Sequence, residues 1–245
     1  MAENASEVSI VVEEKLEFGL VVIRGSMAPV SLQASGARRS NFQKAVSAVI
    51  EKDTSGLFTM DVKIELEWYV PVSTRYETHS IPDLDNVLKP LIDAISGPNR
   101  LMIDDNQVQS ISAAWMDVRL DGVSFELRVS NLSHQSLSPR TGLYFVEVAP
   151  GICIPLFDRY RGEFNDAYVQ NFQFADWTRR ESIKAGMSAD RALAVMPDQR
   201  IFPRARLGGY LVETTPFMTS DSYQAKVREL PRRQGGSLLF PPADD

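Results

Sequence analysis

The chain has 245 residues, of which 44% are hydrophobic and 24% charged, and it carries a formal net charge of −6. This composition is typical of a globular protein with a sizeable core, either one large domain or a domain of about 130 residues with an extension. A single cysteine, Cys153, and two histidines exclude intramolecular disulfides and zinc sites built from cysteine and histidine. The sequence has neither a secretion signal nor an apolar run of membrane-spanning length, so we expect a cytoplasmic protein with no membrane partner.

The negative charge is unevenly distributed along the chain. Residues 1–17 hold five Glu and one Lys, which predicts a flexible acidic arm over residues 1–15. Five aspartates then lie between Asp83 and Asp105. Phosphate binding relies on Lys and Arg, so an acidic protein argues at first against a nucleic-acid partner. Because the acidity is concentrated in the arm and in one cluster, the remaining surface need not repel DNA.

The first half of the chain predicts a compact α/β unit. Residues 16–24 suit a buried strand, and residues 38–51 repeat apolar side chains at helical spacing. Residues 59–70 alternate apolar and charged side chains, which indicates a half-buried strand. A helix that carries the acidic cluster follows and stops near Ser96-Gly97-Pro98.

Two more strands complete this unit, over residues 108–118 and 123–130. The turn Leu120-Asp121-Gly122 between them favours a hairpin. The order strand, helix, strand, helix, strand, strand over residues 16–131 therefore predicts an α/β (α+β) fold, a small mixed β-sheet with flanking helices.

The polar, proline-containing residues 133–140 predict a boundary, so residues 132–245 are a C-terminal extension of unknown fold and function. Within it we expect a strand at 143–148, a helix at 163–185, and a short helix capped by Ser188. This half is rich in aromatic side chains, which is typical of packing against the first domain or against a partner protein.

The acidic cluster is the part of the sequence with the clearest chemistry. Asp83 and Asp85 lie on either side of an expected helix start, and Pro82 favours that entry. Asp85, Lys89 and Asp93 are four residues apart and line one face of a continuous helix. Pro90 lacks an N–H and could bend this helix, which leaves the direction of Lys89 open.

The donor types indicate a hard cation. Carboxylates without histidine or cysteine suit Mg²⁺, or Mn²⁺, with water left for a substrate. Asp104 and Asp105, at the start of the next strand, can supply a third carboxylate, and Lys89 can offset charge on a phosphate. Together these residues favour metal-assisted phosphodiester hydrolysis. Helix capping and a plain helix ion pair are the ordinary alternatives for the same residues.

The cluster also has alternative interpretations. An EF-hand loop is excluded, because Val87 and Leu88 occupy positions that need an oxygen donor and a glycine. A metal-dependent glycosyl or nucleotidyl transferase could use Asp83 and Asp85, although no glycine pattern for nucleotide binding accompanies them. A non-catalytic DNA- or protein-binding module on the same scaffold also stays open.

The string Pro-Asp-Leu-Asp-Asn-x-x-Lys-x-x-x-Asp-Ala-Ile, followed by Asp-Asp-x-Gln-Val, resembles the signature of the RusA-type Holliday junction resolvases. The resemblance extends over roughly residues 16–131. It implies a small α/β nuclease that acts as a homodimer on four-way DNA junctions with Mg²⁺, in recombination and repair. An acidic chain with the additional residues 132–245 departs from the small, basic domain usual in that family.

The resemblance also implies roles for individual residues. Asp83, Asp85 and Asp105 match metal-binding aspartates, and Lys89 matches a catalytic lysine. Asn86, Asp93 and Asp104 match positions with supporting roles, and Asp104 could alternatively be a fourth ligand. The basic residues that we expect to contact the DNA backbone, or else to be solvated, are Arg38, Arg39, Lys44, Arg75 and Arg100.

Overall fold

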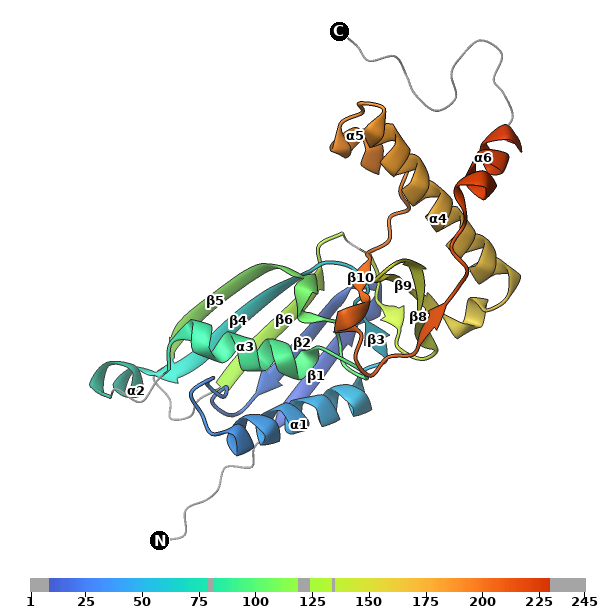
Figure 1. The fold of residues 1–245 in the computed structure, drawn as a ribbon. Helices are drawn as coiled ribbons and strands as arrows, with labels where there is room; N and C mark the ends of the chain where they lie inside the picture. Colours follow the sequence, from blue (N-terminus) through green and yellow to red (C-terminus); the bar gives the residue numbers. More distant parts are fainter. Residues whose placement is uncertain (1–8, 79–81, 119–123, 134, 230–245) are drawn as a thin grey trace. The chain divides into compact units, whose positions relative to one another are not determined.

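The computed structural model describes residues 9–78, 82–118, 124–133 and 135–229 (Figure 1). They belong to two compact units that divide between Thr141 and Gly142. The mixture of helices and several sheets confirms the predicted α+β fold class.

A five-stranded sheet organises the first unit, with its strands in the order β1, β2, β6, β4, β5. Neighbouring strands are antiparallel except β4 and β5, which are parallel. Parallel neighbours need a long crossover connection, and the helix α3 provides it between β4 and β5. The strands are β1 Ile10–Lys15, β2 Leu20–Gly25, β4 Val62–Pro71, β5 Val108–Val118 and β6 Ser124–Asn131.

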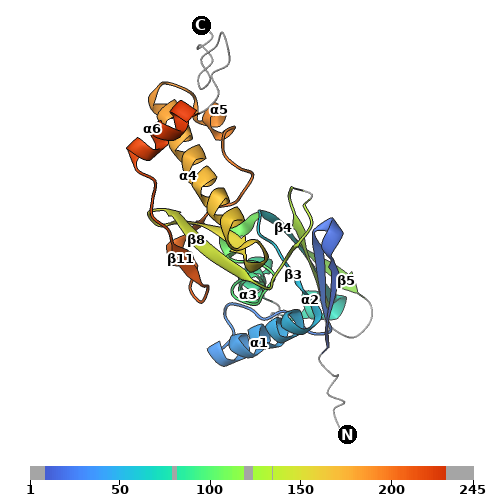
Figure 2. The ribbon, with the colours of Figure 1, turned by 90° about the vertical axis from the view of Figure 1, so that its right-hand side faces the viewer.

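Two helices, α1 (Gly36–Asp53) and α3 (Leu84–Ile95), cover one face of this sheet (Figures 1 and 2). Alternate residues of β4 point into the core between the sheet and the helices, as the period of two in its sequence predicts. The fully buried side chains of β4 in this core are Val62, Ile64, Leu66, Trp68 and Val70. On α1, Phe42, Val46 and Ile50 bury the helix face that meets them.

The opposite sheet face is polar and charged. Arg24 on β2 donates to Glu126 on β6 at 2.6 Å and to Glu13 on β1 at 3.2 Å. Arg128 pairs with Glu126 as well, at 2.5 Å. Lys15 and Arg24 together lower the pKa of Glu13 below its usual range, through hydrogen bonds to its carboxylate. This sheet therefore has one apolar face in the core and one face suited to water, as is common where most strands are antiparallel.

Part of the predicted acidic arm, residues 10–15, forms the strand β1. Residues 10–15 of that arm pair with β2, because Ile10 and Val12 alternate with exposed Val11 and Glu13 and pack against the core. The 3₁₀ turn η1 (Leu16–Phe18) and Gly19 connect the two strands. Gly19 has φ of +55°, and a Cβ there would lie 2.2 Å from the Gln135 carbonyl oxygen. Residues 1–8 of the predicted arm lie outside the described residues.

The predicted hairpin of the last two strands of the first unit is wrong. β4 lies between β5 and β6, and β5 occupies the edge of the sheet. Local alternation in sequence locates each strand correctly but does not specify which strand it pairs with. The predicted turn at residues 120–122 lies outside the described residues.

The first unit continues beyond the predicted boundary at residue 132. Leu137 packs in its core, and β7 (Ser138–Pro139) pairs with β3 (Gly56–Leu57). Arg140 donates to the hydroxyl of Thr54 and to the carbonyl of Gly56. Residues 135–140 are therefore held by the first unit, although they are polar and contain proline.

The second unit has its own small sheet, in the order β10, β9, β8, β11. β8 and β9 form an antiparallel hairpin, while β11 runs parallel to β8. The strands are β8 Leu143–Ala149, β9 Ile152–Phe157, β10 Phe202–Pro203 and β11 Val212–Thr214. The helices and 3₁₀ turns are η3 Asp158–Tyr160, α4 Glu163–Lys184, α5 Ala189–Leu193, η4 Arg204–Arg206 and α6 Ser220–Glu229.

The long helix α4 packs its buried residues Val169 and Phe172 against the β8–β9 hairpin. Asn165, also buried, donates to the Tyr144 hydroxyl at 2.6 Å. The helix expected at 163–185 is therefore present, and Ser188 caps α5 as predicted by accepting from the Arg191 N–H. Within the ranges that the structure describes, none of the helices combines the length and the apolar character needed to cross a bilayer.

Candidate active site

Helix α3 carries Asp85 and Asp93 of the acidic cluster, and Asp83 occupies its cap position. Its apolar side chains at helical spacing are buried against the sheet and α1, among them Val87, Leu91 and Ile95. Pro90 does not break this helix, which is continuous from Leu84 to Ile95. Because Pro90 has no N–H, it cannot bond the Asn86 carbonyl one turn earlier, and the Leu32 N–H donates to that oxygen instead, at 2.8 Å.

The second part of the site is the 3₁₀ turn η2 (Asp105–Gln107), just before β5. Asp104 accepts from the Asn106 N–H at 2.8 Å, and Gln107 accepts from the Ile103 and Asp104 N–H groups at 2.7 and 3.0 Å. The amide nitrogen of Gln107 donates to the carbonyls of Phe58 and Met60, both at 2.9 Å. Gln107 is 0% exposed, so its four hydrogen bonds anchor the turn that presents Asp105.

Lys89 joins the two parts of the site. Its ammonium lies 2.6 Å from an oxygen of Asp93 and 2.7 Å from an oxygen of Asp105. Burial disfavours the charged amine, but the bonds to Asp105 and Asp93 outweigh it and raise the pKa of Lys89 above its ordinary value. Lys89 is therefore cationic at neutral pH. Its side chain points toward Asp105, a direction that the sequence did not predict because of Pro90.

Asp83 and Asp85 lie at the start of α3. Asp83 occupies the cap position, yet its carboxylate makes no capping hydrogen bond, and Asp85 is in the first helical turn. Both side chains are exposed. A carboxylate at a helix start is favoured by the helix dipole. Among the residues that the structure describes, none is bonded to the Asp83 or Asp85 side chain, so both can bind a ligand.

The side chains of the acidic cluster are of the type that binds a hard cation, since they are carboxylates and include no histidine or cysteine. In the described part of the chain, however, no three His, Cys, Asp or Glu side chains gather closely enough to hold an ion. The Asp105 carboxylate is bonded to Lys89. Lys89 lies four residues after Asp85 on α3, and both side chains are exposed. The structure thus brings Lys89, Asp93 and Asp105 together and leaves Asp83 and Asp85 apart from them.

The predicted supporting residues have distinct surroundings. Asp93 holds Lys89 from within α3, and Asp104 shapes the η2 turn through its bond to the Asn106 N–H. Asn86 accepts the loop hydrogen bond from Leu32 through its backbone. Asp104 therefore has the geometry of a turn-forming residue.

The five predicted DNA-contacting residues fall into two groups. Arg38 and Lys44 are exposed on α1, and no side-chain bond to another described residue occupies them. The other three have partners within the unit. Arg39 donates to the Leu32 carbonyl at 2.6 Å, and Arg100 donates to the Asp93 carbonyl near the end of α3.

Arg75, on α2 (Val72–Glu77), pairs with Asp117 at 2.6 Å and lies 5.0 Å above the Trp115 ring. A guanidinium held by a carboxylate and an aromatic face contributes to the packing of α2 on β5.

The sequence indicates a structural or supporting role for Gln107, the glutamine of the Asp-Asp-x-Gln-Val string, and its hydrogen bonds confirm a structural one. The signal was present, because Asp104 and Gln107 have the three-residue spacing of a capping box, and the structure contains that box. The sequence could not show that the far side of the amide reaches the carbonyls of Phe58 and Met60, which are distant in the chain.

The sheet, the buried anchor of the η2 turn and the exposed acidic helix face define an α+β domain in which a lysine joins carboxylates of α3 and η2. Residues 34–128 match the family model of the endodeoxyribonuclease RusA. The resemblance predicted from the motif is thereby confirmed for this part of the chain, which runs from the start of α1 into β6 and includes every acidic residue of the site. No curated protein matches the chain.

Proposed function

We propose that this protein is a Mg²⁺-dependent, structure-selective endodeoxyribonuclease that cuts Holliday junctions or other branched DNA in recombination and repair. The observation that carries the proposal is the match to the RusA family over residues that contain α3 and the η2 turn. The RusA family is one of endonucleases that resolve Holliday junctions.

The metal-binding role proposed for the aspartates rests on the motif resemblance, and the roles of Lys89, Asp93 and Gln107 rest on their contacts. Asp83, Asp85 and Asp105 would hold the Mg²⁺, which supplies Lewis-acid stabilisation and a more acidic water when it is bound. Lys89 stabilises the negative charge that develops on the scissile phosphate, as a positioned cation in a partly desolvated site can do. Asp93 keeps the Lys89 ammonium directed at the Asp105 side of the helix, and Gln107 keeps the η2 turn in place.

Contacts to the DNA backbone are proposed for Arg38 and Lys44, since both are exposed and neither side chain is bonded to another described residue. A two-fold homodimer would present two sites to two symmetrically placed strands, so we propose that the active form is dimeric.

The test is cleavage of a synthetic four-way junction by the full chain with Mg²⁺. We expect cutting by the wild type and strong loss in Asp85→Asn and in Lys89→Ala. Glu51→Gln is the matched control, because it neutralises an exposed carboxylate on α1 that is not part of the acidic cluster, and it should cut normally.

Calorimetry with Mn²⁺ gives a second readout that does not depend on cleavage. Asp85→Asn should bind the ion more weakly, whereas Glu51→Gln should bind it as the wild type does. A wild type that cuts no branched DNA, or an Asp85→Asn variant that cuts as well as the wild type, would contradict the proposal. Junction binding without cleavage, unaffected by Mg²⁺, would favour a non-catalytic binding module instead.

A further inference from the structure

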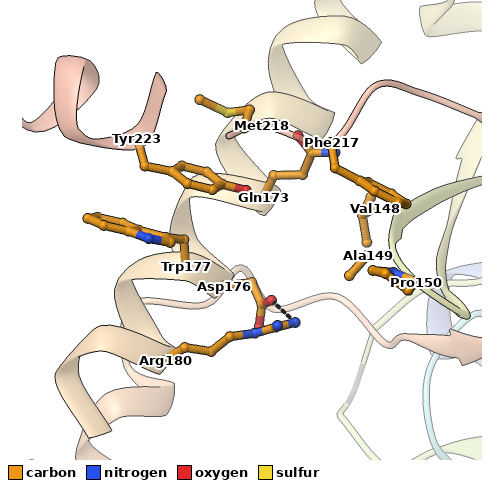
Figure 3. Close-up of a pocket in the computed structure, with 10 residues that line it drawn as sticks. All are labelled: Val148, Ala149, Pro150, Gln173, Asp176, Trp177, Arg180, Phe217, Met218 and Tyr223. Atoms are coloured by element: carbon orange, nitrogen blue, oxygen red, sulfur yellow. Dashed lines mark ion pairs between the residues drawn. The ribbon is translucent and has the colours of Figure 1, made fainter. Parts of the chain in front are cut away.

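The second unit contains a pocket of about 190 Å³, formed by the β8–β9 turn, α4 and the segment that leads into α6 (Figure 3). Apolar groups from the β8–β9 turn and Phe217 form one side. Polar groups of α4 and α6 form the other side, with Gln173 and Tyr223 above the ion pair of Asp176 and Arg180 in Figure 3. A pocket with an apolar wall and a few convergent polar groups is the usual form of a small-ligand site.

The amide of Gln173 is the most informative group in this pocket. The residue is only 3% exposed, and a buried amide normally has several hydrogen bonds. Within the described ranges, its side chain has one such bond, a long contact of 3.5 Å from Nε2 to the Thr215 hydroxyl. Its carbonyl oxygen accepts none from another described residue. Gln173 therefore presents unused donor and acceptor capacity to the pocket.

Two stacked aromatic rings line the pocket beside this amide. Trp177 and Tyr223 are stacked, with their ring centroids 5.1 Å apart and their planes 12° from parallel. Phe174 lies beside both rings, 6.0 Å from Trp177 and 6.4 Å from Tyr223, and thereby packs α6 on α4. Burial, with a further contribution from the Asp176 carboxylate, raises the pKa of Tyr223, so its hydroxyl stays protonated and can donate.

The charged end of the pocket has a fixed arrangement. Asp176 is bonded by Arg179 at 2.7 Å and by Arg180 at 2.6 Å, so its negative charge is compensated by two guanidinium groups. The Arg180 side chain is 48% exposed and has further N–H donors beyond the one bonded to Asp176. Such a guanidinium can bind a phosphate at the mouth of the pocket.

We propose that this pocket binds one nucleotide. The flat faces of the base would lie against the apolar wall, its hydrogen-bonding edge would pair with the Gln173 amide, and Arg180 would contact the phosphate. A glutamine amide can pair with adjacent donor and acceptor atoms on a base, as with N6 and N7 of adenine. The nucleotide could be free or part of an unpaired stretch of a branched DNA strand. Binding of a DNA strand in this pocket rests on the proposed nuclease function, whereas binding of a free nucleotide does not.

The experiment measures binding of two probes to the full chain in EDTA, where metal-dependent cleavage is absent. One probe is a set of 2′-deoxynucleoside 5′-monophosphates, and the other is a short single-stranded oligonucleotide compared with its abasic counterpart. We expect the wild type to bind at least one of them in a base-dependent way. Gln173→Leu, which keeps the side-chain size, should weaken that binding by about tenfold, the loss expected for a base edge left unpaired.

Arg180→Ala should weaken binding of nucleotides but not of the corresponding nucleosides, since only the former carry a phosphate. Arg191→Ala, an exposed arginine on α5 outside the pocket lining, is the matched control and should bind normally. Binding of the monophosphates alone identifies a free nucleotide, and base-dependent binding of the oligonucleotide alone identifies DNA.

The proposal is overturned if the wild type binds neither probe, or if a Gln173→Leu variant with a wild-type circular dichroism spectrum binds both equally well. Neither result bears on junction cleavage, because the nuclease site lies in the first unit. Conversely, a protein that cuts no junction can still give the expected result with the monophosphates.

Discussion

The strongest structural prediction concerns Gln107→Leu. The substitution keeps the volume of a side chain that is 0% exposed but removes four hydrogen bonds at once. Two of the groups left behind, the Ile103 N–H and the Phe58 carbonyl, are in buried surroundings. The other two, at Asp104 and Met60, are part-buried and can be reached by water more easily.

A buried polar group that loses its partner costs roughly 1–3 kcal/mol. Two such groups predict a loss of roughly 2–6 kcal/mol in the free energy of unfolding, a large share of the stability of about 5–15 kcal/mol that domains commonly have. We also expect junction cleavage to fall in the remaining folded protein, because the turn that presents Asp105 has lost its anchor.

The assay is urea unfolding followed by tryptophan fluorescence. The chain has three tryptophans, so a Trp177→Phe background leaves Trp68 and Trp115 as reporters of the first unit alone. A loss of stability below about 1 kcal/mol would refute the account, because it would mean that water or a rearranged backbone satisfies the two buried groups at little cost.

Three further predictions follow from other features. Lys89→Met should slow junction cleavage by roughly 10²–10³-fold, because the cation that stabilises the phosphate is lost. The Mn²⁺ affinity, measured by calorimetry, should stay equal or rise, because a positive charge beside Asp105 is removed. A wild-type cleavage rate would contradict the role of Lys89. Gly19→Ala should lower the unfolding free energy by roughly 2 kcal/mol or more, because it combines a left-handed φ with a clash at a carbonyl, whereas Gly36→Ala, with open space around it, should not. Burial raises the pKa of the Cys153 thiol, so a thiol reagent should label it only after the second unit unfolds. Because the unfolded thiol loses its proton at a lower pH than the folded one, the stability of that unit should decline as the pH rises past the ordinary thiol pKa, and a flat profile in urea titrations would contradict this.

The sequence predicted well those elements whose signal is local. The alternation in β4 and the apolar spacing in α1 and α3 gave the correct element types, because one buried face determines each pattern. Residues 10–15 carried a similar alternation, but the high glutamate content suggested an arm. In the structure these glutamates lie at the sheet surface, where Glu13 pairs with Lys15 and Arg24, and Glu14 accepts the Gly56 N–H at 2.7 Å.

The sequence did not predict features that depend on pairing between segments far apart in the chain. The period of two identifies β5 and β6 but does not show that β4 separates them. In the second unit, β9, β10, β11 and α6 were not predicted. Of these, β10, β11 and α6 are stabilised by partners far along the chain, which their own short sequences do not reveal.

The site shows the same division. The spacing of Asp85, Lys89 and Asp93 predicted a shared helix face, and the structure has Lys89 bonded to Asp93. That Lys89 also reaches Asp105 depends on how Gln107 holds the η2 turn against the segment between β3 and β4, which spacing alone does not reveal.

Pro90 has a consequence beyond the shape of α3. A proline inside a helix releases one carbonyl from the helical ladder, and here that acceptor, on Asn86, is taken by the Leu32 amide of the loop before α1. The loop proton is thus protected by the helix that bears the acidic cluster, although residue 32 lies in no regular element. In amide hydrogen exchange, Leu32 should open together with α3 and not with its sequence neighbours, so a single loop amide would report on the integrity of the helix that carries Asp85 and Lys89.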